Sequence, residues 1–203
     1  MESAMLGSVV LSTLVGYLSG SCLAAPWICR WAGVADPRSR GSCNPGFSNM
    51  LRLYGIRLAL MTLVLDAAKG VPAVLSLKLL GGPVWAQGIA GAAVLLGHSY
   101  PVWHRFRGGK SVASAFGVLL VLAPAVALGS AALWSLLAWR LKTAAMASLA
   151  SAMAAPLLCL WWTPRYIVVV GGFSLLIVAR HWLNIRRMGR GTEPSLRRQR
   201  PGR

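Results

Sequence analysis

The sequence predicts an all-α bundle of transmembrane helices, and the prediction depends on composition, on the length of the apolar segments and on the placement of charge. Of the 203 residues, 56% are hydrophobic and only 12% are charged, whereas a soluble domain usually has about 25% charged residues. Too few polar side chains are present to cover a soluble surface, so lipid is the expected solvent. The length suits one compact bundle. We expect one integral membrane domain over residues 1–194, followed by a basic cytoplasmic tail over residues 195–203.

Several apolar segments are long enough to form spanning helices, which need about 20 residues each. The expected helices cover residues 4–27, 55–80, 84–102, 144–162 and 166–182. The segment 111–139 is also apolar, but Pro124 lies near its middle and should break it. We expect two short helices there, each about 20 Å long. The polytopic bundle would then contain about seven transmembrane helices.

The basic residues indicate the orientation of this bundle. Lys and Arg contribute 21 residues and the net charge is +17, with basic clusters in segments 30–52 and 105–110 and in the C-terminal tail. Because positive loops stay on the cytoplasmic side, we expect the N-terminus outside, the C-terminus cytoplasmic and only Lys78 and Arg165 on the outer side. The basic residues punctuate apolar segments, so we expect anionic membrane lipids as partners and no nucleic acid.

Cysteine and histidine patterns give no indication of a metal centre. The four cysteines form no CxxC pair, and the three histidines form no ligand cluster with them. We therefore expect no metal and no cofactor.

The first segment whose residue types suggest binding or catalysis covers residues 36–52 and begins at Asp36. Glycines alternate there with small hydroxyl and amide side chains, and arginines flank them. Successive backbone N–H groups in such a segment can form an anion nest, and Arg52 lies at the start of the following helix. This composition suits a phosphate group, although an ordinary turn-rich loop remains an alternative. The segment has no Walker pattern, which argues against a nucleotide P-loop.

The second segment covers residues 97–111. Gly108, Gly109 and Lys110 directly precede a short helix, whose N-terminus attracts anions. A basic membrane anchor would explain the same residues. His98, near the end of the preceding helix, is either a functional group or a hydrogen-bonded structural histidine.

The third segment covers residues 180–193. If its helix continues, His181 and Asn184 share one face and can reach a polar substrate together. A separate pair, Asp66 and Lys69, lies one turn apart inside an apolar helix. Burying such an ion pair costs several kcal/mol per ion, so a functional or orienting role is favoured over a purely structural one.

These segments together resemble the PlsY family, the bacterial acyl-phosphate:glycerol-3-phosphate acyltransferases. That family carries a GSxNxGxxN-type loop followed by Arg, then Asp-x-x-Lys-Gly, GHxxP…FxGGK, and an Arg-His-x-x-Asn element that ends in Gly-Thr-Glu. The corresponding segments here are 41–52, 66–70, 97–110 and 180–193. The match is collinear over about residues 16–194.

The resemblance implies a seven-helix protein of the bacterial inner membrane with a cytoplasmic active site. It implies transfer of a fatty acyl group from acyl phosphate to the 1-hydroxyl of sn-glycerol 3-phosphate, giving lysophosphatidic acid and phosphate in the first step of phospholipid synthesis. We expect no covalent acyl-enzyme, and the HxxxxD motif of other acyltransferases is absent. The enzyme that produces the acyl phosphate is a further expected partner.

The same resemblance implies a role for each matching position. The catalytic positions are Ser42, Arg52, Lys110, His181 and Asn184. The substrate-binding positions are Asn44, Gly46, Ser48, Asn49, Gly108 and Gly109. The supporting positions are Asp36, Asp66, Lys69, His98 and Glu193.

Three positions depart from the family pattern. Cys43 and Ser111 replace glycine, and Ser48 replaces the commoner threonine. A Cβ at position 43 or 111 would strain a backbone that needs positive φ. Two alternatives therefore stay open: an inactive or altered-specificity paralogue, and a transporter of an anionic metabolite. Against the transporter, the polar groups cluster at one face rather than at the membrane midplane.

Overall fold

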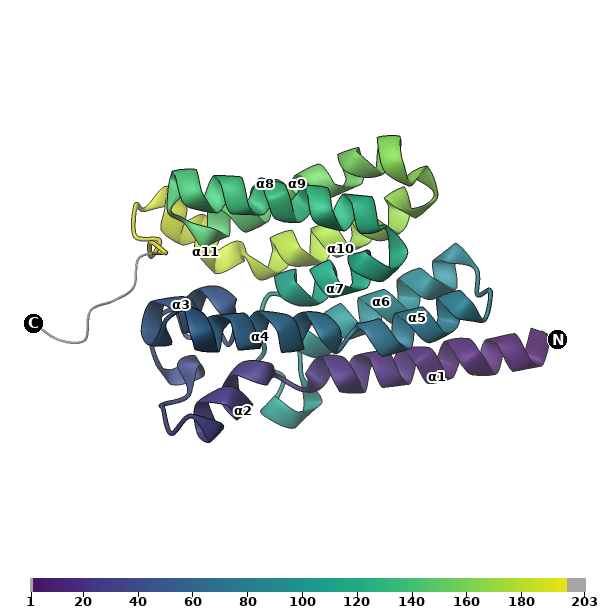
Figure 1. Ribbon diagram of the computed structural model, residues 1–203, viewed down its shortest axis with the longest axis horizontal. Coiled ribbons are helices and arrows are strands. Elements are labelled where there is room, and N and C mark those ends of the chain that lie inside the picture. Colours follow the sequence, from purple (N-terminus) through teal and green to yellow (C-terminus); the bar gives the residue numbers. More distant parts are fainter. Residues whose placement is uncertain (1, 197–203) are drawn as a thin grey trace, which may run out of the picture.

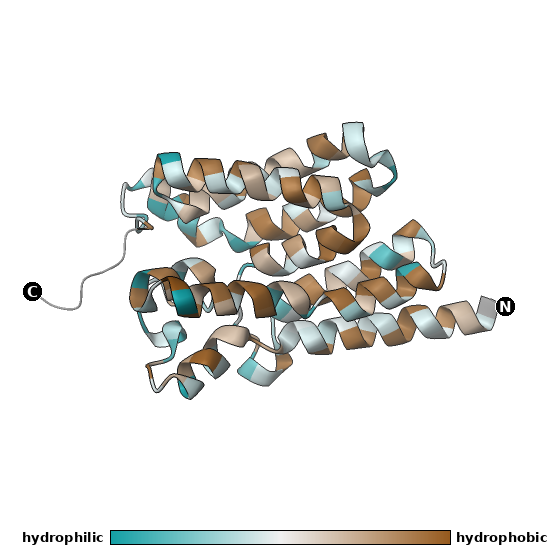
Figure 2. Ribbon diagram, viewed as in Figure 1, coloured by the Kyte–Doolittle hydropathy of each residue, from teal (hydrophilic) through white to brown (hydrophobic). Residues whose placement is uncertain are grey.

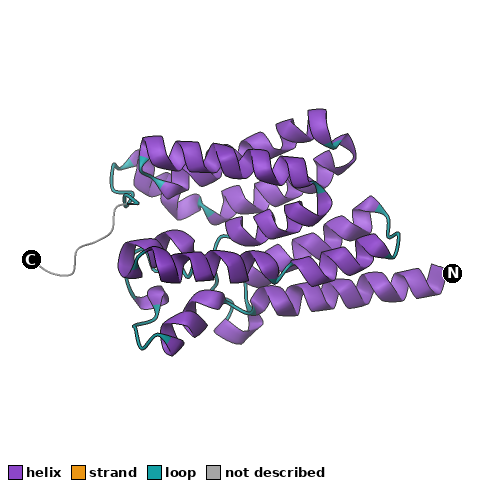
Figure 3. Ribbon diagram, in the orientation of Figure 1, coloured by secondary structure: helices purple, strands orange, loops and turns teal. Residues whose placement is uncertain are grey.

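The computed structural model describes residues 2–196, and every regular element in that part of the chain is a helix (Figure 1 and Figure 3). The α-helices are α1 (Glu2–Ser21), α2 (Ala24–Trp31), α3 (Phe47–Tyr54), α4 (Ile56–Ala68), α5 (Val71–Leu79), α6 (Val84–Ser99), α7 (Val112–Leu122), α8 (Pro124–Leu141), α9 (Ala144–Trp162), α10 (Ile167–Arg180) and α11 (Trp182–Gly189). Three short 3-10 helices lie at Pro37–Ser39, Val102–His104 and Pro164–Tyr166. The predicted all-α fold class is confirmed.

Four helices within residues 2–196 are long and apolar enough to cross a membrane: residues 3–21, 56–79, 124–141 and 144–162. The second of these joins α4 and α5 into one span of 24 residues. A fifth is reached if α10 and α11, bent by 55°, count as one broken span. The other apolar helices, α6 and α7, are shorter. The chain is therefore a multi-pass membrane protein, and the expected number of seven spans stays a prediction.

Glycines allow the first helix to approach α6 closely. A Cβ at Gly20 would lie 2.3 Å from the carbonyl oxygen of Val94, and one at Gly97 would lie 2.2 Å from the carbonyl oxygen of Tyr17. Small residues are the usual device for close helix packing in lipid, where no hydrophobic force drives helices together. This packing places the C-terminal ends of α1 and α6 side by side, next to the residues that begin loop 100–111.

The predicted break at Pro124 is confirmed, but the two halves are unequal. Ala123 separates α7, with 11 residues, from α8, with 18 residues. Pro124 occupies the first position of α8, where its missing N–H group costs no hydrogen bond. The expectation of two similar short helices is therefore wrong, because α8 continues to Leu141 and reaches spanning length.

Two other predicted helices end earlier than expected. The first ends at Ser21 rather than near Trp27, and the chain continues as the separate helix α2. The last, expected to end near Trp182, ends at Arg180, and the chain bends at His181 into the separate helix α11, so the helix does not continue straight through Asn184. The backbone N–H of His181 bonds the carbonyls of Ile177 and Val178, which closes α10 before α11 begins.

The long helices run side by side along the long axis of the molecule, with α2, α3 and α11 at one end (Figure 1). Hydrophilic residues gather at this end and in the turns at the opposite end, while the long helices are largely hydrophobic (Figure 2). The main core lies among α5, α6, α7, α8, α9 and α10, with Val94, Val118 and Val170 almost fully buried. A smaller core, centred on Met50, joins α2, α3 and α4. The short helices thus cover one end of an apolar bundle.

Candidate active site

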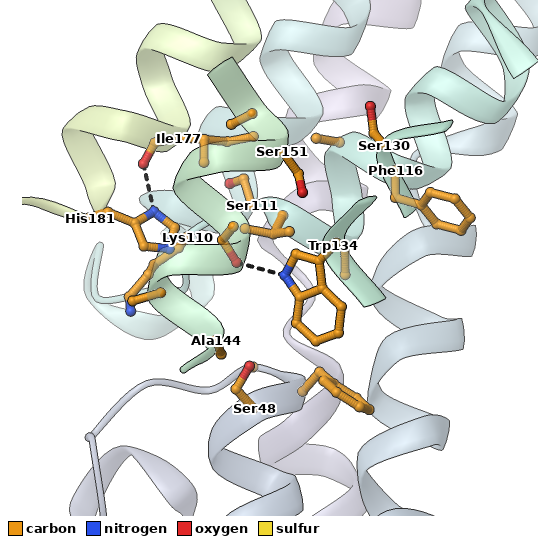
Figure 4. Close-up of a pocket in the computed structure, with 18 of the residues that line it drawn as sticks. Ser48, Lys110, Ser111, Phe116, Ser130, Trp134, Ala144, Ser151, Ile177 and His181 are labelled. Atoms are coloured by element: carbon orange, nitrogen blue, oxygen red, sulfur yellow. Dashed lines mark hydrogen bonds between the residues drawn. The ribbon is translucent and has the colours of Figure 1, made fainter. Parts of the chain in front are cut away.

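A single cavity of about 400 Å³ connects the polar end of the bundle with its apolar interior (Figure 4). Its walls come from α3, α4, α7, α8, α9, α10 and α11 and from the loops beside them. The predicted site residues that line it are Ser42, Asn44, Gly46, Ser48, Arg52, Asp66, His98, Lys110, His181, Asn184 and Glu193. Segments separated by as many as 150 residues therefore meet at one place.

The polar segment over residues 36–49, here called loop 1, includes the first turn of α3 and is held together by Asn49 of that turn. This side chain is fully buried. Its carbonyl oxygen accepts from the backbone N–H of Ser42 at 3.0 Å, and its amide donates to the carbonyls of Pro37 and Arg40 at 2.9 and 3.0 Å. Asn49 does not line the cavity. It supports the loop that presents Ser42, Asn44 and Ser48.

Asp36 closes the start of loop 1. Its carboxylate accepts from the backbone N–H of Arg38 at 2.8 Å and forms an ion pair with the same guanidinium at 2.6 Å. Burial raises the pKa of Asp36, but the bonds and charge of Arg38 outweigh it, so the pKa lies below its ordinary value. Asp36 braces the loop and does not line the cavity.

Arg52, on the last turn of α3, faces the same space as loop 1. It is 4% exposed, and it donates to Oγ of Ser42 at 3.3 Å and to the backbone carbonyl of Ser195 at 2.7 Å. Burial lowers its pKa, although an arginine stays charged in either case. A buried guanidinium beside a serine hydroxyl is a strong donor set for a phosphate group.

The second polar loop, here called loop 2, covers residues 100–111 and carries Lys110. The backbone N–H of Gly109 donates to the carbonyl of His98 at 2.9 Å, and Arg180 donates to the carbonyl of Gly109 at 3.1 Å. The Arg180 guanidinium also lies over the ring of Tyr100, 4.7 Å from its centre. Gly108 and Gly109 do not line the cavity, but they allow this close backbone approach. A Cβ at Gly109 would lie 2.2 Å from the ring of His98.

The buried pair of Asp66 and Lys69 acts on loop 2 through His98. The carboxylate and ammonium are 3.0 Å apart, and Lys69 also lies 2.7 Å from Nδ1 of His98. Lys69 further donates to the carbonyl of Cys22 at 3.1 Å. This network fixes the imidazole ring against which Gly109 packs. The orienting role predicted for the pair agrees with this geometry.

His181, Asn184 and Glu193 form the third part of the site, at the bend between α10 and α11. Nδ1 of His181 donates to the carbonyl of Ile177 at 2.8 Å, which leaves Nε2 as the acceptor of the neutral ring. The amide of Asn184 donates to one oxygen of Glu193 at 2.7 Å. The other Glu193 oxygen is buried and has no hydrogen-bond partner within residues 2–196.

The polar end of the cavity carries an excess of positive charge. Burial, together with the nearby cations Arg52, Arg187 and Arg180, lowers the pKa of Lys110 to about 8, although the charge of Glu193 opposes this shift. Figure 4 shows Lys110 beside His181 on one side of the cavity. Because one carboxylate faces several cations here, the site is electrostatically suited to anionic groups.

The remainder of the cavity is an apolar groove that the sequence did not indicate. It is lined by small and apolar residues of α7, α8, α9 and α10, among them Phe116, Ala131, Ala152 and Phe173. Trp134 crosses it and donates to Ser148 at 2.9 Å (Figure 4). Within the described residues the hydroxyls of Ser130 and Ser151 have no hydrogen-bond partner. The only signal in the sequence was the abundance of alanine and serine in these helices.

The two departures from glycine occupy the strained conformation that was expected. Cys43 has φ 57° and Ser111 has φ 61°, both left-handed. Their surroundings differ, since Cys43 is exposed whereas Ser111 is fully buried. Both residues therefore hold the left-handed conformation despite carrying a Cβ.

Comparison with known proteins identifies the family. Residues 10–191 match the family model described as glycerol-3-phosphate acyltransferase. Glycerol-3-phosphate acyltransferase of Chromohalobacter salexigens is 56% identical over 186 residues, covering 92% of this chain and 91% of the relative. That of Hahella chejuensis is 37% identical over 188 residues, covering 93% and 97%.

Solved structures of the same family share the fold. The glycerol 3-phosphate form of PlsY (YgiH), an integral membrane glycerol 3-phosphate acyltransferase, has a TM-score of 0.85 and 30% identity, covering 93% of this chain and 95% of that one. Its lysophosphatidic acid form has a TM-score of 0.82 and 31% identity at the same coverage. The chain therefore belongs to the PlsY family of integral membrane glycerol-3-phosphate acyltransferases.

Proposed function

We propose that this acyltransferase takes its fatty acyl group from acyl phosphate, transfers it to the 1-hydroxyl of sn-glycerol 3-phosphate, and releases lysophosphatidic acid and phosphate. The supporting observation is that one cavity joins a cluster of cations to an apolar groove. Both substrates carry a phosphate, and one also carries a long alkyl chain. A site with two anion-binding loops at its polar end and an apolar groove behind them suits this pair.

The two loops divide the binding of the two phosphates. We assign the donor phosphate to loop 1, where Ser42, Asn44, Gly46 and Ser48 line the cavity beside Arg52. We assign glycerol 3-phosphate to Lys110, His181 and Asn184, which line the same cavity. Arg52 lies between the two sites and bonds to Ser42, so it can contact either phosphate.

The reaction needs positioning and charge stabilisation more than a protein nucleophile. The 1-hydroxyl oxygen attacks the carbonyl carbon, the bond from that carbon to the phosphate oxygen breaks, and phosphate leaves with the electron pair. The hydroxyl proton passes to Nε2 of His181 or to a substrate phosphate. Arg52 and Lys110 stabilise the negative charge that develops, which is the largest contribution in most acyl transfers.

We also propose that the polar end faces the cytoplasm and that the membrane is the bacterial inner membrane. The positive-inside rule supports this orientation, because the basic loops 1 and 2 and helix α11 lie at the same end. Anionic lipids would contact these basic residues. The proposed tail begins at residue 195. Ser195 and Leu196 are hydrogen-bonded to Arg52 and Lys142, and residues 197–203 lie outside the described residues.

The donor is tested with purified protein in detergent, labelled glycerol 3-phosphate and three donors: acyl phosphate, acyl-CoA and acyl carrier protein thioester. We expect lysophosphatidic acid only with acyl phosphate, and none when Lys110 is replaced by alanine. Product from a thioester but not from acyl phosphate would overturn the donor assignment. The absence of product from all three would overturn the proposed activity.

The orientation is tested separately by labelling Cys43, whose thiol is exposed in loop 1. In a Cys22→Ser background, a membrane-impermeant maleimide should label Cys43 in inverted vesicles and not in intact spheroplasts. The reverse pattern would place the polar end outside.

A further inference from the structure

Ser111 occupies a backbone conformation that normally requires glycine. With φ 61° and ψ 12° it is left-handed, and it lies between Lys110 and the first residue of α7. An L-residue in this region brings its Cβ close to its own backbone carbonyl. A serine at this position is therefore unfavourable unless its side chain makes compensating interactions.

The side chain of Ser111 makes two such interactions. It is 1% exposed, its hydroxyl donates to the carbonyl of Leu95 at 2.6 Å, and it shares a hydrogen bond with the hydroxyl of Ser99 at 2.7 Å. Leu95 and Ser99 belong to the last turns of α6. The hydroxyl thus connects the start of α7 to the end of α6, directly beside Lys110.

Cys43 in loop 1 is a natural control for this interpretation. It has nearly the same φ of 57°, yet it is exposed, and its thiol makes no hydrogen bond to residues 2–196. A left-handed non-glycine residue therefore does not by itself require a buried bonded side chain. The two hydrogen bonds of Ser111 are a specific feature of loop 2.

These bonds complete the fixation of the backbone that carries Lys110. On the N-terminal side, Gly109 is held by the carbonyl of His98 and by Arg180. On the C-terminal side, Ser111 directly follows Lys110, and its hydroxyl bonds it to α6. Two glycines precede Lys110, so without both attachments the loop has much conformational freedom.

We propose that Ser111 is a positioning residue of the transfer reaction, whose hydroxyl, through Leu95 and Ser99, places the ammonium group of Lys110 at the substrate phosphate. The proposal rests on the proposed role of Lys110. A misplacement of about 1 Å at a catalytic group can cost about a hundredfold in rate. Serine in place of glycine makes the left-handed backbone at position 111 less favourable, but its hydroxyl fixes the position of Lys110.

The test compares Ser111→Gly, Ser111→Ala and Ser99→Ala with Cys43→Gly as the matched control. The measurements are kcat, KM for glycerol 3-phosphate, and the pH dependence of kcat/KM. We expect about a tenfold loss of kcat/KM for Ser111→Gly and Ser111→Ala. The upper pH limit should also shift, because the surroundings of Lys110 change. Cys43→Gly should keep the wild-type pH profile.

Folding and the proposed activity are controlled independently. Melting temperature and elution in detergent show whether each variant folds, and a double variant of Ser111→Gly with Ser99→Ala should lose no more than Ser111→Gly alone. Glycerol 3-phosphate affinity, measured by thermal shift, should fall in the Ser111 variants even without an acyl donor.

A folded Ser111→Gly protein with wild-type kcat/KM, pH profile and affinity would overturn the positioning role, because the hydroxyl would then only offset strain. A wild type that forms no product with any donor, but whose affinity for glycerol 3-phosphate still depends on Ser111, would overturn the proposed activity and leave the role of Ser111 in positioning Lys110 for binding.

Discussion

The two polar loops of the site both contribute residues to the cavity but are held in different ways. Loop 1 is held from within by the single buried side chain of Asn49, which bonds to residues within 12 positions of itself. Loop 2 is held by α6 through His98 and by α10 through Arg180. One polar loop beside the cavity thus depends on a local hydrogen-bond centre, and the other depends on packing between distant helices.

The largest expected effect comes from removing one cavity group from each loop. Lys110→Ala and Ser42→Ala should each abolish detectable turnover, since one lost donor to a developing oxyanion costs about a hundred- to a thousandfold. The measurement is lysophosphatidic acid formation from acyl phosphate. Lys142→Ala is the control, because this lysine lies over the Trp139 ring and does not line the cavity. A wild-type rate in either loop variant would refute the assignment of that loop.

The next effect distinguishes, within loop 1, the side chain that holds the loop from a side chain that lines the cavity. Asn49→Ala removes three hydrogen bonds at once, and a cost of about 2–4 kcal/mol in unfolding free energy is expected. Asn44→Ala, in the same loop but lining the cavity, should raise KM for acyl phosphate and leave stability unchanged. Denaturant unfolding in detergent measures the first quantity and steady-state kinetics the second. Equal unfolding free energies of the two variants would contradict the role of Asn49 in holding loop 1.

The pH dependence of kcat/KM should follow the titration of Lys110 in loop 2 and should not depend on loop 1. Lys110, with a pKa of about 8, is charged below that value and loses its charge as pH rises through it. The kcat/KM for glycerol 3-phosphate should therefore fall above about pH 8, by up to about tenfold per pH unit. Glu193→Gln removes the charge that raises this pKa, so the fall should begin at lower pH.

Lys110→Arg is the control for this assignment, because arginine stays charged over the measured range. Its kcat/KM should be lower than that of wild type but should not decline near pH 8. A decline at the same pH in the arginine variant would assign the titration to another group.

The smallest expected effect is that of Cys43→Gly on stability. Relief of the left-handed strain gains about 1–2 kcal/mol, while the added freedom of the unfolded chain costs about 0.4–1 kcal/mol. The net change should be a stabilisation of about 0.5–1 kcal/mol, seen in the unfolding midpoint. A clear destabilisation would show that the Cys43 side chain supports loop 1, contrary to its exposure.

Much of the site could be predicted because its residue types are unusual for a membrane chain. Ser42, Arg52, Lys110, His181 and Asn184 belong to the polar segments that connect or end the apolar helices, and all five line the cavity. Asn49, Gly108, Gly109, Asp36 and Lys69 lie behind it. A short motif places residues near a site, but which side chain faces the ligand depends on loop geometry.

The groove and the helix ends could not be predicted, because their residues carry no distinctive pattern. Alanine and serine on α8 and α9 look the same whether they pack against a neighbouring helix or line a cavity. The end of the last helix was predicted near Trp182, but the bend at His181 and the new helix α11 were not, because no proline or glycine marks the bend and α10 is closed there by backbone bonds.

The amino-acid sequence was sufficient to predict an integral membrane protein and a break in the chain near Pro124, and its resemblance to the PlsY family grouped the polar segments into one expected site. Hydrophobicity, proline and charge act locally, so they can be read along the chain. The tertiary structure alone decided that Asn49 supports loop 1 from behind the cavity, that Asp66 acts on loop 2 through His98, and that Ser111 is bonded to α6. These roles depend on distances between segments far apart in sequence, which only the packing of the helices sets.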